Sequence, residues 1–212
     1  MLFVCFWAVC NLTLFAQVVS GPRIIHPREE SVIHVPPQEA PAGLKKIYSN
    51  LGKSKTDLYL DNSAWVIAGP NSVSGAEFIG LPFTPKSDSH VSQARVAVEY
   101  DHRGTNQVNL SIYSDSSGSP GTLLAGPVTV TNLPKAGTCC VLTVADFTPL
   151  AVTGGTQYWV VVDTPLTGTG SDFYGSWDFV VQALPQAFSN GSNWYLQDVN
   201  EQVAGEVLGT IP

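Results

Sequence analysis

Charged residues are scarce in this chain. Asp, Glu, Lys and Arg make up 13% of its 212 residues, about half of the roughly 25% that is usual for globular proteins. Polarity comes instead from Ser, Thr, Asn, Gln and Gly, a composition common among secreted β-proteins. Basic residues are the scarcest, because the stretch from Ile47 onward contains 6 Lys and Arg against 14 Asp and Glu. An acidic stretch without a basic cluster binds phosphates poorly, so we expect no nucleic acid partner.

Helix-forming sequence and cysteine are also sparse. The chain has 19 Gly and 15 Pro residues, which disfavour long helices. Of its four cysteines, two lie in the N-terminal apolar segment, and Cys139 and Cys140 are adjacent. Two interpretations of this pair are open: free thiols packed as small hydrophobic groups, or a vicinal disulfide. We favour free thiols, because a disulfide between neighbours demands special geometry.

The N-terminal 46 residues divide into two parts. Leu2–Val19 is almost continuously apolar, so we expect residues 1–20 to be a cleaved secretory signal peptide and the protein to be secreted or on the cell surface. The alternative is a retained N-terminal anchor, since no basic residue follows Met1 and about 18 apolar residues are enough for a membrane span. Residues 21–46 contain five prolines, which predict an extended, semi-rigid linker.

Residues 47–212 show the period-two alternation of β-strands. In Ser92–Tyr100, apolar residues alternate with Gln93, Arg95 and Glu99. Tyr158–Val162 is too apolar to have a solvated face, so we expect it to be a central strand. Turn formers separate the segments, and no amphipathic helix is evident. The pattern predicts one all-β domain, a two-sheet antiparallel β-sandwich that is jelly-roll-like.

The order of several short motifs in this domain resembles that of a known family. The most specific block is Val108–Ala125 (VNLSIYSDSSGSPGTLLA); Trp65–Gly69 (WVIAG) precedes it, and Thr156–Trp159 (TQYW) and Val207–Gly209 (VLG) follow. This order is similar to that of the bacterial choice-of-anchor domains. The resemblance implies a secreted module for which no common ligand or activity is established. No C-terminal anchor motif follows the last block, so we expect free secretion.

Catalytic motifs are not evident. His90 and His102, the two histidines of the domain, lie in predicted turns, and there is no Gly-x-Ser-x-Gly motif. We therefore predict a non-catalytic module with a structural or recognition role, with a glycan or envelope polymer as its partner. The alternatives are a glycoside hydrolase acting through loop carboxylates and a protein–protein adhesion domain using sheet edges. A membrane is a partner only if the N-terminal segment is retained.

A ligand-site hypothesis rests on aromatic and acidic residues near the C-terminus, because aromatic side chains are enriched at recognition sites. In a strand, Asp172, Tyr174 and Asp178 share a face that we expect to be solvated, while Trp177 points into the core. The predicted ligand-binding residues are Asp172, Tyr174, Asp178, Trp194 and Tyr195. No cofactor is predicted, and structural calcium is left unassigned between two acidic loops, Asp57 with Asp61 and Asp115 with Ser116.

Overall fold

A computed structural model describes residues 22–25, 33, 35, 38–53 and 58–212. The predicted signal peptide, residues 1–20, lies outside these ranges. Within them, no helix has the length and hydrophobicity needed to cross a membrane. The described chain folds into two antiparallel sheets, which confirms the predicted β-sandwich.

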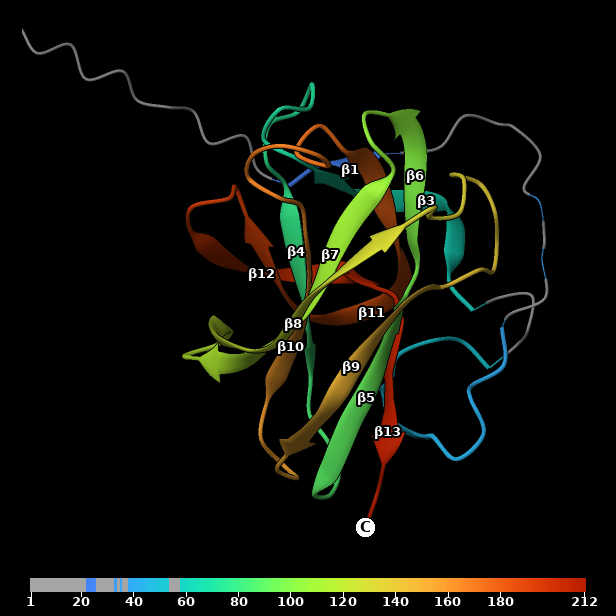
Figure 1. The fold of residues 1–212 in the computed structure, drawn as a ribbon, viewed down its shortest axis with the longest axis vertical. Coiled ribbons are helices and arrows are strands. Elements are labelled where there is room, and N and C mark those ends of the chain that lie inside the picture. The colour runs from blue at the N-terminus through green and yellow to red at the C-terminus, as the bar shows by residue number, and fades with distance from the viewer. Residues whose placement is uncertain (1–21, 26–32, 34, 36–37, 54–57) are drawn as a thin grey trace, which may run out of the picture.

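The larger sheet has nine strands and the smaller has four (Figure 1). The path through the larger sheet is β1 (Ile24–Ile25), β3 (Leu60–Ala68), β11 (Tyr174–Ser189), β4 (Phe78–Phe83), β10 (Tyr158–Asp163), β7 (Gln107–Ser116) and β8 (Ser119–Thr131), with β6 (Val98–Arg103) and β12 (Trp194–Val203) also paired to β11. The smaller sheet is ordered β2 (Lys45–Ser49), β13 (Gly205–Thr210), β5 (Ser89–Val96) and β9 (Thr143–Val152). In Figure 1, β9, β5 and β13 lie side by side in the lower part of the view.

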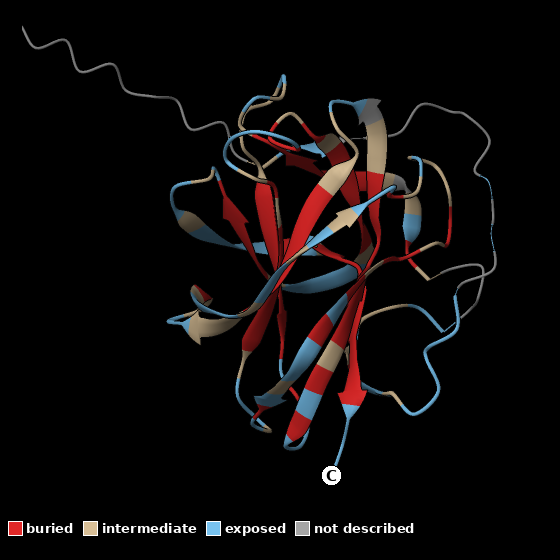
Figure 2. Ribbon diagram, in the orientation of Figure 1, coloured by how far each residue is buried: buried red, intermediate tan, exposed pale blue. Residues whose placement is uncertain are grey.

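The main hydrophobic core lies between the two sheets, and buried residues follow the strands of both (Figure 2). β10 is the central strand that its composition predicts, because it pairs with β4 on one side and β7 on the other. Trp177 is fully buried, as predicted, and its indole Nε1 donates to the carbonyl of Ala204 at 2.8 Å. Trp65 is also in the core and donates to the carbonyl of Glu201 at 2.7 Å. Both bonds satisfy the polar atom of a large buried ring.

The segment predicted as a single strand over Ser92–Tyr100 is divided between the sheets. β5 ends at Val96 and β6 begins at Val98, so Ala97 is the crossing point. The Ala97 amide donates to the carbonyl of Ala204 at 3.1 Å. The alternation correctly assigns apolar residues to the core. It does not reveal that the polar alternates are also buried, with Gln93, Arg95 and Glu99 between 2% and 4% exposed.

The described part of the predicted linker packs against the sandwich. We call residues 22–25, 33, 35 and 38–44 the strap. β1 of the strap pairs with β3 at the edge of the larger sheet. Farther along, the Ile33 amide donates to the carbonyl of Gly137 at 3.0 Å. The carbonyl of Gln38 accepts a bond from the Arg95 guanidinium, which the strap thereby helps to bury.

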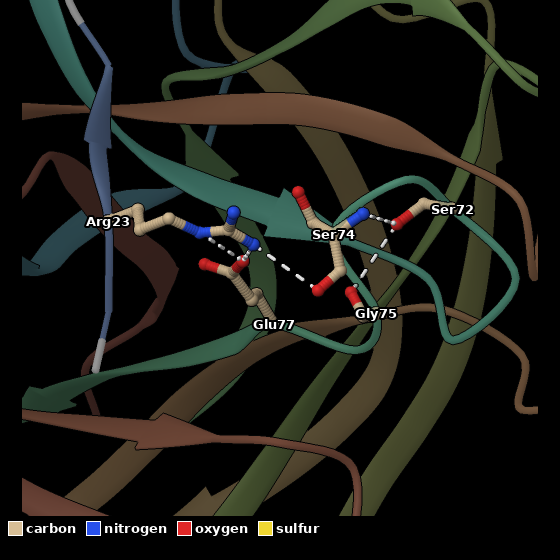
Figure 3. A network of polar contacts seen from close by, with 5 residues as sticks. All are labelled: Arg23, Ser72, Ser74, Gly75 and Glu77. Carbon is tan, nitrogen blue, oxygen red and sulfur yellow. Dashed lines mark hydrogen bonds and ion pairs between the residues drawn. The ribbon is translucent and has the colours of Figure 1, made fainter. Parts of the chain in front are cut away.

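A polar network fixes the start of the strap (Figure 3). Arg23 pairs with the carboxylate of Glu77 and donates from Nη2 to the carbonyl of Ser74 at 3.2 Å. The hydroxyl of Ser72 supports the same turn by accepting from the Ser74 amide at 3.1 Å. Burial raises the pKa of Glu77, and the bonds from Arg23 oppose that rise.

We expect Arg23→Ala to lower the free energy of unfolding by less than about 1 kcal/mol, because ion pairs with an exposed partner contribute little. The Arg23 side chain is 46% exposed. Chemical denaturation at low and high ionic strength measures the effect, and the loss shrinks in high salt because exposed charges are screened. A loss well above 2 kcal/mol, or one that is independent of salt, would contradict this assignment.

Candidate functional site

Aromatic side chains meet on the outer face of the larger sheet. Trp159 of β10 is opposite Tyr113 of β7, and it packs with Val161 and Ala187 in a hydrophobic cluster separate from the main core. Tyr113 and Trp194 lie against this cluster and are partly exposed, whereas Trp159 is fully buried. We call these five residues the outer cluster. It presents two partly exposed rings above a buried apolar floor.

Asp115, beside the hairpin turn between β7 and β8, accepts hydrogen bonds from Trp159 of the outer cluster and from two residues near it. The indole Nε1 of Trp159 and the amide of Gln157 each donate to Oδ1 of Asp115 at 2.8 Å, and the Gly118 amide donates to Oδ2 at 3.1 Å. Burial raises the pKa of Asp115, but these hydrogen bonds outweigh it and lower the pKa below its usual value. Both carboxylate oxygens are therefore used to hold Trp159 and the turn in place.

A row of polar side chains borders the outer cluster along β10, β7 and β8. Asp163 accepts from the amide of Asn109 at 3.1 Å, and Asn109 in turn accepts from the hydroxyl of Thr129 at 3.0 Å. Burial raises the pKa of Asp163 to about 6, against the effect of the bond from Asn109. Burial raises the pKa of the Tyr113 phenol, and the nearby carboxylate of Asp163 raises it further. Hydrogen-bonding groups and aromatic rings thus share this face.

Trp194 and Tyr195, which the sequence analysis predicted together, lie on opposite faces of β12. Tyr195 pairs with Phe188, and directly opposed residues share a face of the sheet. The Phe188 ring is in the main core, so Tyr195 is on the core side, where it remains 42% exposed at the edge. Trp194 is therefore the predicted residue that joins the outer cluster.

Asp172 and Tyr174 lie near the opposite end of β11 from the turn that carries Trp194. Asp172 accepts from the Thr105 amide at 3.0 Å, and this backbone hydrogen bond lowers its pKa. The Arg103 guanidinium lies 5.3 Å from the centre of the Tyr174 ring, a cation–π arrangement. Asp172 and Tyr174 therefore each contact residues of the segment 103–105, away from the outer cluster.

The prediction that Asp178 faces water is wrong. Its side chain is 1% exposed, because Tyr59 and the segment after Lys135 cover this face of β11. Tyr59 donates to the carbonyls of Thr138 and Val141 at 3.4 and 3.3 Å. Burial raises the pKa of Asp178 well above its usual value, and the nearby carboxylates of Glu99 and Asp61 raise it further. An acidic cluster is therefore enclosed at this position.

The preference for free thiols at Cys139 and Cys140 is also wrong, since the two cysteines form a vicinal disulfide. Both are buried, and they belong to a turn that precedes β9. We call residues 135–141 the disulfide loop. Glu99 holds this loop by accepting from the amides of Gly137 and Thr138 at 2.8 and 3.1 Å.

A separate groove lies between the edge strands β8 and β9. Its volume is about 460 Å³, and it is lined by Leu124–Gly126 and Val128 on one side and by Asp146–Leu150 on the other. Phe147 is the aromatic residue of this lining, and it is 8% exposed. The groove thus has a mixed lining, in which Asp146 and Thr148 lie among aliphatic residues.

Across the described ranges, no three His, Cys, Asp or Glu side chains are arranged to hold a metal ion. Of the calcium hypotheses, Asp57 lies outside the described residues, and Asp115 is committed to Trp159, Gln157 and Gly118. No family model matches the chain, and neither does any curated protein or solved structure.

Proposed function

We propose that this protein is a non-catalytic extracellular recognition module that binds a glycan at the outer cluster. The observation that carries the proposal is the pair of partly exposed rings, Tyr113 and Trp194, set on one face above buried Trp159. Aromatic side chains supply a large, rigid apolar surface on which the apolar face of a sugar ring can stack. Asp163, which is half-buried, stands beside them as a partner for sugar hydroxyls, and Asn109 holds its carboxylate in place.

The location outside the cell is supported by the sequence. The apolar run Leu2–Val19 is typical of a signal peptide, and the low content of charged residues is common in secreted β-proteins. The resemblance of the motif order to choice-of-anchor domains agrees with a secreted module. We therefore propose that the glycan belongs to the cell envelope or to a secreted matrix.

A glycan array probed with the full chain tests this proposal. We expect binding to at least one polysaccharide, and we expect Trp194→Ala and Tyr113→Ala each to weaken it at least about tenfold. Tenfold corresponds to about 1.4 kcal/mol, within the range of a well-placed aromatic anchor at an interface.

Tyr195→Ala is the matched control, because Tyr195 adjoins Trp194 and is exposed but lies on the opposite face. It should retain the affinity of the unmodified protein. Circular dichroism and thermal melting of each variant separate a lost contact from a lost fold. The proposal fails if no glycan binds at high protein concentration, or if Trp194→Ala and Tyr195→Ala have the same effect.

A further inference from the structure

Three carboxyl groups lie near one another beneath the disulfide loop, on Asp61, Glu99 and Asp178. Besides burial, Glu99 and Asp61 raise the pKa of Asp178, and Asp61 also raises that of Glu99. All three carboxyl groups likewise raise the pKa of the Tyr59 phenol, which lies among them. None of the three has an ion pair with a described Lys, Arg or His. Oδ2 of Asp178 is buried and has no hydrogen-bond partner. Burying an unpaired carboxylate is costly, and such a group takes up a proton instead.

The peptide unit of Gly137 connects this acidic cluster to the strap. Its amide donates to Glu99 at 2.8 Å, while its carbonyl accepts from the Ile33 amide at 3.0 Å. The next contact is similar, because the Cys140 amide donates to the carbonyl of Val35 at 3.1 Å. A movement of the disulfide loop away from Glu99 therefore carries the strap contacts with it.

We infer that Glu99 and Asp178 form a proton-operated latch, which holds the disulfide loop, and with it Ile33 and Val35 of the strap, on the sandwich at acidic pH and releases them as the pH rises. In the closed state the two buried side chains retain protons. Opening admits water, the carboxyls ionise, and their protons pass to the solvent. Each group that ionises only on opening favours the open state by up to about tenfold per pH unit.

The other side chains around the latch reinforce this direction. Asp61 on β3 adds a further negative charge, and Tyr59 supplies a neutral hydroxyl. From the disulfide loop, Lys135 is exposed and forms no ion pair with the described carboxylates. From the strap, Ile33 and Val35 are uncharged. The amides of Gly137 and Thr138 act in the opposite direction, because their bonds stabilise the charged form of Glu99. Burial outweighs them and raises the pKa of Glu99 to about 7, which places its transition near neutral pH.

Hydrogen exchange of single amides, followed by NMR between pH 6 and pH 8, tests the latch on the full chain. After correction for the intrinsic pH dependence of exchange, we expect the opening constants of Gly137, Thr138 and Ile33 to rise about tenfold or more. The amide of Val160 in central β10 is the internal reference and should change much less.

Asp178→Asn and Glu99→Gln should each reduce the rise at Gly137 and Ile33, because each variant removes one of the two groups that ionise on opening. The double variant should reduce the rise to that of Val160. Asp163→Asn is the matched control, since Asp163 is a half-buried carboxyl with a raised pKa that lies on β10, beside the outer cluster and away from the disulfide loop. It should leave the response unchanged. Opening constants that are independent of pH, or a rise that is undiminished in every latch variant that folds, would overturn the inference.

Discussion

Replacing Glu206 by glutamine is expected to lower the free energy of unfolding by about 3 to 5 kcal/mol, the cost of leaving a buried charge without its partner. Oε1 of Glu206 accepts from Nη1 of Arg95 at 2.9 Å, and both side chains are 4% exposed. Within the described residues, the other hydrogen bond of the guanidinium is to the strap carbonyl of Gln38, which carries no net charge. Urea denaturation at neutral pH measures the loss.

Lys46→Met is the matched control for this prediction. Nζ of Lys46 lies 3.1 Å from Oε2 of Glu206, but the lysine side chain is 62% exposed, so its loss should cost less than about 1 kcal/mol. The double variant Arg95→Met with Glu206→Leu should recover most of the stability, because it removes both buried charges together. Equal losses for Glu206→Gln and Lys46→Met would show that Arg95 does not depend on this carboxylate.

The strands and their core-facing residues were predictable from the sequence. The apolar run Tyr158–Val162 predicted a central strand, and the alternation in Ser92–Tyr100 placed Ala94 and Val96 in the core, where they are fully buried. A period of two is enough for this, since side chains of a strand alternate between its faces. Turn residues between the apolar segments predicted many short strands, a pattern that favours a two-sheet sandwich.

The covering of the outer faces was not predictable from the same pattern. Arg95 and Glu99 occupy the polar positions of their strands, which alternation alone assigns to solvent, yet the strap and the disulfide loop bury them. Asp178 is misassigned for the same reason. Alternation is a local property of one strand, whereas the burial of its second face depends on segments far away in the chain.

The candidate site was predictable only in part. Trp194 was identified as an aromatic residue after a turn, but Tyr113 and Asp163 were missed because each lies in a strand that was judged by its core face. The sequence did contain one indication of the site, because Trp159 and Val161 are apolar residues at the outward positions of β10. An outward apolar pair indicates that something covers that face, although it does not identify the covering residues.

Replacing Asp178 by asparagine is expected to raise the free energy of unfolding by about 2 kcal/mol at pH 8, within the range for relieving an unsatisfied buried group. The sign follows from proton binding. The unfolded chain loses this proton at the usual pKa of an aspartate, whereas the folded chain retains it to a higher pH because burial raises the pKa of Asp178. Stability is therefore lost as the pH rises through that interval, and asparagine abolishes the loss.

At pH 3 and below, the carboxyl is largely protonated in both states, because the usual pKa of an aspartate is about 3.9, so Asp178→Asn and the unmodified protein should have similar stability. Asp172→Asn is the control of opposite sign, because the backbone bond from Thr105 lowers the pKa of Asp172 and stabilises its charged form. It should lower stability at pH 8. If Asp178→Asn destabilises the protein equally at pH 3 and pH 8, the aspartate contributes through its shape and hydrogen bonding, and its ionisation does not control the stability of the fold.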